Sequence, residues 1–214
     1  MKNIKSTDNT SLSFQRKGKD LLKNLEIASQ TPISENLQGI AVILLDISSS
    51  MAGNKIEQAK LGAIDFAEGS KKMGLKFGLV TFGSFAKKII SHENNIERLK
   101  AIINKIEVSG STNMSDAIEM SIELCQHEHG KKTFCIVTDG MPDDPQKTIE
   151  LARRAKSCGI HILTIGTDDA DNNFLSQLAT KKDYNTIIDS KNLRNSLSSV
   201  VKMLPGLDGL NTKI

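Results

Sequence analysis

Apolar residues along this chain alternate between short continuous runs and longer segments with helical spacing. The run Ile40–Leu45 is fully apolar, whereas apolar positions in 55–73 recur every three to four residues. Runs of the first kind predict strands at 40–46, 75–82, 86–90, 132–138, 160–166 and 184–188. Segments of the second kind predict helices at 55–73, 94–106, 115–128, 145–158, 171–181 and 190–204.

This alternation predicts the α/β class, with a three-layer, doubly wound and mostly parallel sheet between two layers of helices. Helical crossovers join parallel strands and are right-handed. The strand at 86–90 follows the strand at 75–82 through Gly83-Ser84, a connection too short for a crossover. We therefore expect one short antiparallel strand at the edge of the sheet.

The segment before this domain has a different pattern. Residues 1–36 form an N-terminal extension, in which Leu21, Leu22, Leu25 and Ala28 predict one amphipathic helix over 12–29. The domain proper is expected over 37–205, and 206–214 form a tail. The predicted helix has two interpretations, packing against the domain or docking a partner.

Three short loops carry the side-chain oxygens that a binding site would need. Asp46-Ile47-Ser48-Ser49-Ser50 follows the first predicted strand, Thr138-Asp139-Gly140 follows the fourth, and Gly110-Ser111-Thr112-Asn113 precedes a helix. Open α/β sheets bind ligands beyond the carboxyl ends of their strands. The loops are therefore expected at the edge where a ligand would bind.

These loops resemble the metal-ion-dependent adhesion site (MIDAS) of von Willebrand factor A (vWA) domains. The resemblance rests on Asp-x-Ser-x-Ser at 46–50, Gly-Ser-Thr at 110–112 and Thr-Asp-Gly at 138–140, and it covers about residues 39–204. Met51 and Gly53 also match the family, whereas Ser49 stands where glycine is usual. The resemblance implies a vWA (Rossmann-like) fold and a metal held by Asp46, Ser48, Ser50, Thr112 and Asp139.

All of these side chains offer oxygen, which suits a hard cation such as Mg²⁺, with Mn²⁺ or Ca²⁺ as alternatives. Two carboxylates roughly neutralise a divalent ion, and hydroxyls donate weakly. The ion would therefore accept one more anionic oxygen. In the family that the chain resembles, a Glu or Asp of a protein partner supplies it.

Each loop alone has a simpler interpretation. Thr112 or Ser115 could cap the helix that follows, and Asp139-Gly140 could be a turn. The combination of three loops in the family's order favours the metal site. The acidic residues in 141–144 and 168–171 could cap helices or restrict the choice of partner.

The histidines offer a weaker site. His127 and His129 are two residues apart and do not share a helix face. His161 lies on a predicted strand, where packing or hydrogen bonding is the simpler role.

Enzymatic motifs are missing from the sequence. It contains neither a nucleophile elbow, nor a phosphate-binding P-loop, nor a His-Glu-x-x-His motif. Phosphatases of the haloacid-dehalogenase type require a second carboxylate at position 48, which is Ser48 here. We therefore expect a non-enzymatic, metal-dependent scaffold or adaptor that resembles small bacterial proteins of tellurite-resistance stress systems. An adaptor of an AAA+ ATPase, as in chelatases, is the alternative, and a metal-dependent phosphohydrolase ranks lower.

Composition narrows the setting. The net charge of the 214 residues is only +3, which argues against nucleic-acid binding. The three cysteines, Cys125, Cys135 and Cys158, are expected to be buried free thiols in a reducing compartment. Neither a secretory signal nor an apolar run of bilayer length is visible. A cytoplasmic protein without membrane contact is expected, and its oligomeric state stays open.

Overall fold

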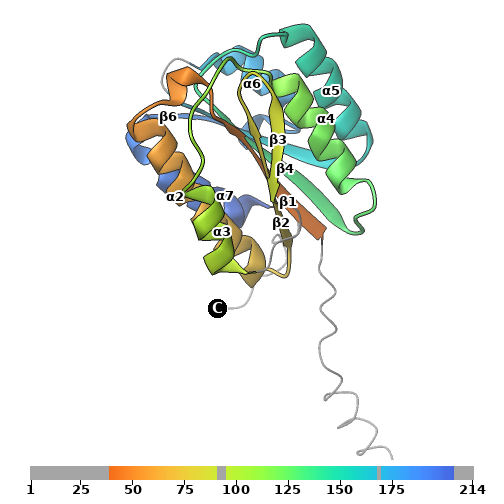
Figure 1. Ribbon diagram of the computed structural model, residues 1–214. Coiled ribbons are helices and arrows are strands. Elements are labelled where there is room, and N and C mark those ends of the chain that lie inside the picture. The colour runs from red at the N-terminus through yellow and green to blue at the C-terminus, as the bar shows by residue number, and fades with distance from the viewer. Residues whose placement is uncertain (1–38, 91–94, 168–169, 205–214) are drawn as a thin grey trace, which may run out of the picture. The chain divides into compact units, whose positions relative to one another are not determined.

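The computed structural model describes residues 39–90, 95–167 and 170–204, and it forms a single sheet covered by helices (Figure 1). The predicted helix at 12–29 and the tail at 206–214 lie outside the described residues. The strands are β1 (Gly39–Asp46), β2 (Lys76–Phe82), β3 (Ala86–Ile90), β4 (Lys131–Thr138), β5 (Ile160–Thr167) and β6 (Asn185–Ile188).

The strand order is β3-β2-β1-β4-β5-β6, and every neighbouring pair is parallel except β2 and β3. This confirms the predicted α/β class and the antiparallel edge strand. The order reverses direction between β1 and β4, because the chain first winds outward to β3 and then returns to the other side of β1. Ligands of doubly wound sheets bind at such a reversal point.

The helices within the described residues are α2 (Asn54–Lys72), α3 (Ile96–Ile103), α4 (Met114–Cys125), α5 (Pro145–Ser157), α6 (Asn172–Leu178) and α7 (Leu193–Val200). Short 3₁₀ turns lie at Ser49–Met51, Lys182–Tyr184, Ser190–Asn192 and Val201–Met203. None of the described helices is both long and apolar enough to cross a membrane.

Some helices are shorter than the predicted ranges, for local reasons. The helix predicted at 94–106 begins at Ile96, because the Asn95 side chain accepts a hydrogen bond from the Arg98 amide and caps it. The helix predicted to end at 181 stops at Leu178. Beyond it, the Thr180 hydroxyl accepts a hydrogen bond from the Ile162 amide at 2.8 Å, which ties the chain to β5.

The helix predicted at 190–204 is also shorter. It is divided into α7 and two flanking 3₁₀ turns. Asp189 accepts a hydrogen bond from the Lys191 amide and fixes the first of these turns.

Both faces of the sheet are packed, which explains the continuous apolar runs in the central strands. Along β1, alternate side chains enter opposite cores: Ala41, Ile43 and Leu45 on one side, Ile40, Val42 and Leu44 on the other. Helices α2, α3 and α7 cover the first face, and α4, α5 and α6 cover the second (Figure 1). The central strands therefore form a rigid support, at whose carboxyl ends the polar loops begin.

Candidate metal centre

Asp46 is the last residue of β1, and its side chain is completely buried. One carboxylate oxygen, Oδ1, accepts a hydrogen bond from the Ser48 amide at 2.7 Å. The other, Oδ2, accepts one from the Thr138 hydroxyl at 2.5 Å. Burial raises the pKa of Asp46, while the hydrogen bonds from Ser48 and Thr138 act in the opposite direction.

The strand register explains the contact between Asp46 and Thr138. Leu45 of β1 pairs with Val137 of β4, so the next residues on the two parallel strands lie side by side. Thr138 is also completely buried, and its hydroxyl accepts a hydrogen bond from the Gly140 amide at 3.2 Å. The same threonine therefore orients the Asp46 carboxylate and the start of the loop that carries Asp139.

Ser48, Ser50 and Asp139 form a chain of hydrogen bonds beside Asp46. The Ser48 and Ser50 hydroxyl oxygens are 3.0 Å apart, and the Ser50 hydroxyl donates to Asp139 Oδ1 at 2.7 Å. The second oxygen of Asp139 accepts a hydrogen bond from the Lys55 ammonium group at 2.7 Å. Ser48 and Asp139 are buried, whereas Ser50 is exposed.

A 3₁₀ turn at Ser49–Met51 brings the serines into this arrangement. The Met51 side chain is fully buried in the core formed with α2, which anchors the turn. Gly53 follows with a φ of +77°, a conformation that non-glycine residues rarely adopt. The chain can then turn directly into α2, which carries Lys55 toward Asp139.

Thr112 lies in a neighbouring loop that backbone contacts hold in place. The Ser49 amide donates to the Gly110 carbonyl at 3.1 Å, which joins this loop to the first one. The Thr112 amide donates to Asp143 Oδ1 at 3.1 Å, and the Ser111 hydroxyl donates to Asp143 Oδ2 at 2.7 Å. The Asp143 carboxylate thus holds the loop that carries Thr112. From the sequence, Asp143 was one of the acidic residues that could restrict which partner binds.

The sequence suggested Thr112 or Ser115 as the cap of α4, but neither residue caps this helix. The cap is Asn113, whose side-chain oxygen accepts a hydrogen bond from the Asp116 amide at 3.3 Å. Asn is as good a capping residue as Ser or Thr, and it lies immediately before the helix. Within the described residues, the Thr112 hydroxyl makes no hydrogen bond.

The structure thus unites four of the predicted ligands, Asp46, Ser48, Ser50 and Asp139, in one cluster at the reversal point of the sheet. Thr112 is fixed beside the first loop through its neighbours, without a contact from its hydroxyl to that cluster. Sequence reasoning missed Thr138 and Lys55. Thr138 had a signal, a hydroxyl at the end of an apolar strand, whereas Lys55 looked like an ordinary residue on a helix surface.

The donor chemistry of this cluster fits a hard divalent cation. Two buried carboxylates face hydroxyl groups, and the ammonium group of Lys55 already shows that a cation is accommodated beside Asp139. No group of three or more His, Cys, Asp or Glu side chains in the described ranges is arranged to bind a metal. A site that depends on serine and threonine hydroxyls is consistent with that finding.

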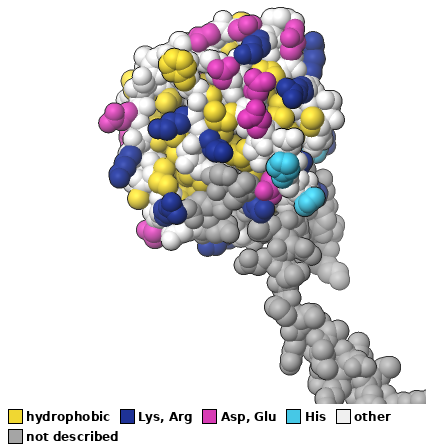
Figure 2. Space-filling view, turned by 45° about the vertical axis from the view of Figure 1, so that its right-hand side comes forward, with side chains coloured by type: hydrophobic (Ala, Val, Ile, Leu, Met, Phe, Trp, Pro, Cys, Tyr) yellow, Lys and Arg dark blue, Asp and Glu magenta, His cyan; other side chains and the backbone are white. Residues whose placement is uncertain are grey.

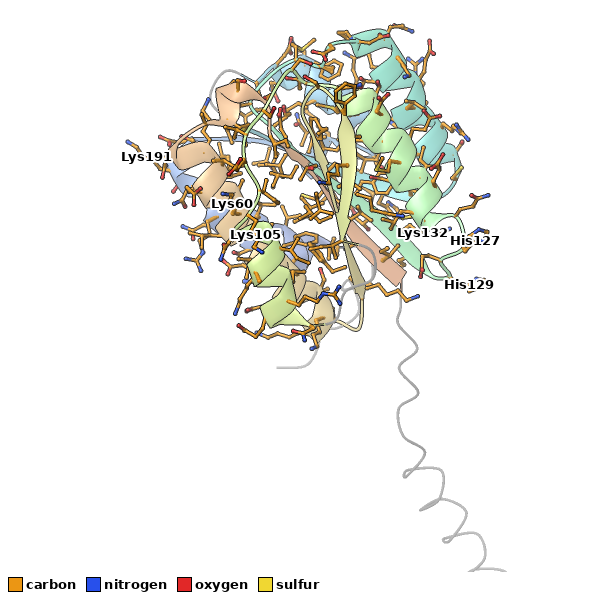
Figure 3. The ribbon with its side chains drawn as sticks, viewed as in Figure 1. Lys60, Lys105, His127, His129, Lys132 and Lys191 are labelled. Carbon is orange, nitrogen blue, oxygen red and sulfur yellow. The ribbon has the colours of Figure 1, made fainter. Side chains whose placement is uncertain are left out.

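The histidines lie elsewhere. His127 and His129 are exposed in the segment between α4 and β4 (Figure 3). This segment leads into the amino-terminal end of β4, whereas Asp46 lies at the carboxyl end of the parallel neighbour β1. His161 packs near Tyr184, with ring centroids 6.5 Å apart, and burial lowers the pKa of His161. Asp171 caps α6 by accepting a hydrogen bond from the Phe174 amide. Residues 168 and 169 lie outside the described part.

The cysteines are free, but they differ in exposure. Cys125 and Cys135 are buried, and burial raises the pKa of each thiol to about 12. Cys158 is exposed at the end of α5, so the expectation that all three are buried was wrong for this residue. It follows a helix end, where the chain leaves the core to turn at Gly159.

Surface charge is mixed. On the face in Figure 2, Lys and Arg side chains alternate with Asp and Glu over an otherwise neutral surface. A single-sign stripe, which a nucleic acid would require, is not visible on this face.

Comparison with known proteins places the chain among related sequences. The family model described as "von Willebrand factor type A domain" matches residues 41–202. Inter-alpha-trypsin inhibitor heavy chain H1 of Mesocricetus auratus is 26% identical over 167 residues, covering 70% of this chain and 18% of that protein. A UPF0353 protein of Mycolicibacterium vanbaalenii is 24% identical over 148 residues, covering 60% of this chain and 44% of its own.

Solved structures share the fold. Proximal thread matrix protein 1 from the mussel byssus superposes with a TM-score of 0.69 at 21% identity, covering 78% of this chain and 47% of that chain. A structure of the same protein with a zinc-occupied MIDAS motif gives a TM-score of 0.66 at 22% identity, covering 80% of this chain and 48% of that chain. The chain thus spans less than half the length of each of these proteins.

Proposed function

This chain belongs to the von Willebrand factor type A family, and from that premise we propose that it is a metal-dependent protein-binding module. Domains of this family act in protein interaction and adhesion. In the proposal, a divalent cation held by Asp46, Ser48, Ser50, Thr112 and Asp139 binds an acidic residue of a protein partner. The module acts as a scaffold or adaptor and not as an enzyme.

One observation carries the proposal: two buried carboxylates and two serine hydroxyls are gathered at the reversal point of the sheet. Burying a carboxylate is costly unless charge or hydrogen bonds compensate for it. Two buried carboxylates beside the exposed Ser50 therefore lower the stability of the fold unless a positive charge compensates for them, which favours a role in binding a cation. Asp46 and Asp139 would supply negative charge to the cation, and the hydroxyls of Ser48, Ser50 and Thr112 neutral oxygens.

Mg²⁺ is the cation that we propose, with Mn²⁺ or Ca²⁺ as alternatives. The mussel protein holds zinc at its motif, but zinc prefers nitrogen and sulfur donors. The cluster described above offers oxygen alone, which favours hard cations. When bound, the cation would supply a positive charge for an external carboxylate. The oxygen ligands of the protein would fix the position of the cation.

The cellular setting is also part of the proposal. The resemblance to stand-alone bacterial proteins of tellurite-resistance type supports a cytoplasmic scaffold in a stress response. The similarity to a mycobacterial protein is compatible with a bacterial role. Because this chain spans a minor part of its relatives, their other segments give no guidance on its partners.

The test uses the hydroxyl of Thr112. Thr112→Ala removes one proposed ligand and leaves the backbone contacts with Asp143 and the neighbouring loop intact. The midpoint temperature should fall by about 2–4 °C, because buried Thr112 loses a methyl group and a hydroxyl that makes no hydrogen bond among the described residues. Mn²⁺ affinity, measured by titration, should fall about tenfold or more. Thr112→Ser keeps the hydroxyl and serves as the matched control, with affinity close to that of the wild type.

Partner binding completes the test. Tagged wild type and both variants are used to capture proteins from native lysate, in Mg²⁺ and in EDTA. Proteins retained by the wild type and Thr112→Ser in Mg²⁺ alone should be lost with Thr112→Ala. Equal Mn²⁺ affinity in all three proteins, or identical captured proteins with and without EDTA, would reject the proposal.

A further inference from the structure

Lys55 is placed where a lysine is electrostatically unfavourable. It is the second residue of α2, and the amino-terminal end of a helix carries a partial positive charge that repels cations. Its ammonium group nevertheless reaches back to Asp139, 84 positions along the chain, at 2.7 Å. The Lys55 side chain is 23% exposed and that of Asp139 only 1%, so the contact is largely shielded from solvent.

The two oxygens of Asp139 have different partners. Oδ1 accepts a hydrogen bond from the Ser50 hydroxyl, and Oδ2 accepts one from Lys55. Ser50 is one of the proposed metal ligands, so a cation held by this set shares Asp139 with the lysine. In this arrangement Lys55 would place a positive charge beside a bound metal ion.

This charge changes the electrostatic balance expected from the sequence. Asp46 and Asp139 together carry two negative charges, which would neutralise a divalent cation. With Lys55, these side chains carry a net charge of −1, and the site with a divalent ion carries +1. In a partly buried site such a charge is screened less than at the surface.

We infer that Lys55 makes this site selective for anionic partner groups. It does so by weakening the binding of the cation alone, so that an anionic partner becomes necessary for tight binding. The inference rests on the proposed function and adds a condition to it. The partner group must carry negative charge, as a Glu or Asp carboxylate does. A neutral oxygen ligand such as a hydroxyl or amide leaves the loaded site with an uncompensated positive charge.

The experiment measures Mn²⁺ binding to the full chain by isothermal titration. Lys55→Met removes the charge and keeps an aliphatic side chain of similar length. It should bind Mn²⁺ about tenfold more tightly than the wild type, since a like charge close to the ion is lost. Lys55→Arg keeps the charge and should bind as the wild type does.

Lys147→Met is the matched control for the loss of one positive charge. Lys147 is the third residue of α5, close to a helix start as Lys55 is, and it pairs with Asp116 at 3.1 Å. That ion pair is exposed and is not part of the proposed site. The variant should show the Mn²⁺ affinity of the wild type.

A second arm uses acetate as the anionic probe. The gain in Mn²⁺ affinity on adding acetate should be larger for the wild type than for Lys55→Met. Both proteins are compared at the same acetate concentration, so that the weak complex of acetate with free Mn²⁺ affects them equally. Thermal unfolding of each variant, recorded in EDTA, shows whether the comparison is between folded proteins.

The outcomes separate the two proposals. If the wild type and all variants fail to bind Mn²⁺, the metal-dependent function is wrong, and the role of Lys55 with it. If the wild type binds and Lys55→Met binds equally or more weakly, the role of Lys55 alone is wrong. If Lys55→Arg tightens binding as much as Lys55→Met, the effect does not come from charge, and the inference fails as well.

Discussion

Thr138 provides a hydrogen bond on which the burial of Asp46 depends, and Thr138→Val tests this dependence. Valine has nearly the shape of threonine but lacks the hydroxyl, so Asp46 Oδ2 loses its donor and the Gly140 amide loses an acceptor. Both Asp46 and Thr138 are completely buried. A hydrogen bond to a charged group contributes about 1.5–3 kcal/mol.

We therefore expect the free energy of unfolding to fall by about 2–3 kcal/mol. For a protein of this size the midpoint temperature should fall by about 4–12 °C. The loss should be greatest above the pKa of Asp46, which burial raises, and it should shrink as the pH falls through that value. A protonated carboxyl group depends less on an external donor, which gives the sign of this change.

The assay is urea unfolding followed by circular dichroism, in EDTA. Thr167→Val is the matched control, because Thr167 ends β5, is completely buried and has no hydrogen-bond partner for its hydroxyl among the described residues. Its substitution should leave stability within about 0.5 kcal/mol or increase it. An equal loss in both variants, or a Thr138→Val protein as stable as the wild type, would refute the reasoning.

Two further predictions concern other parts of the domain. Asp65 accepts hydrogen bonds from Arg194 at 2.7 and 3.2 Å, and this contact lowers the pKa of Asp65. Asp65→Asn should lower the free energy of unfolding by about 0.5–1 kcal/mol at neutral pH. In urea titrations this difference from the wild type should begin to shrink as the pH falls below 3.8, the ordinary pKa of the carboxyl group, and should vanish below the lowered pKa of Asp65 in the folded protein. A difference that persists when folded Asp65 is protonated would contradict this prediction. A thiol reagent at neutral pH should label exposed Cys158 rapidly. Cys125 and Cys135 should react only after unfolding, because burial keeps these two thiols protonated. Mass spectrometry of the native protein would contradict this prediction by showing two rapidly attached labels.

Sequence patterns predicted the parts of this structure that local chemistry determines. The run Ile40–Leu45 required a strand buried on both faces, and the position of Asp46 directly after it placed a carboxylate at the edge of the sheet. The order of the strands, with a reversal between β1 and β4, then brings Asp139 beside the serines of the first loop. Periodicity and strand ends were sufficient for the strand and for the place of Asp46, whereas the order of the strands, and with it the contact between Asp139 and Ser50, is a finding of the structure.

The remaining features depend on contacts between distant residues. Thr138 meets Asp46 because of strand register, and Lys55 meets Asp139 across 84 positions. No local pattern identifies either pair. The same reason explains the early end of α6, since Thr180 is held by a backbone amide of β5 and leaves the helix.

The two carboxylates of the candidate site differ in a way that bears on its function. Asp139 already has a cationic partner in Lys55. Asp46, by contrast, accepts its hydrogen bonds from neutral groups, the Ser48 amide and the Thr138 hydroxyl. The charged side chain that acts on Asp46 is Asp139, and it raises the pKa of Asp46 further. Asp46 thus carries the less compensated charge, and a divalent cation that approached this site would gain most of its attraction there. In the proposed site, a cation held chiefly by Asp46, with Asp139 partly neutralised, would retain positive charge for an external carboxylate, and the proposal would thereby connect the burial of Asp46 with an acidic partner.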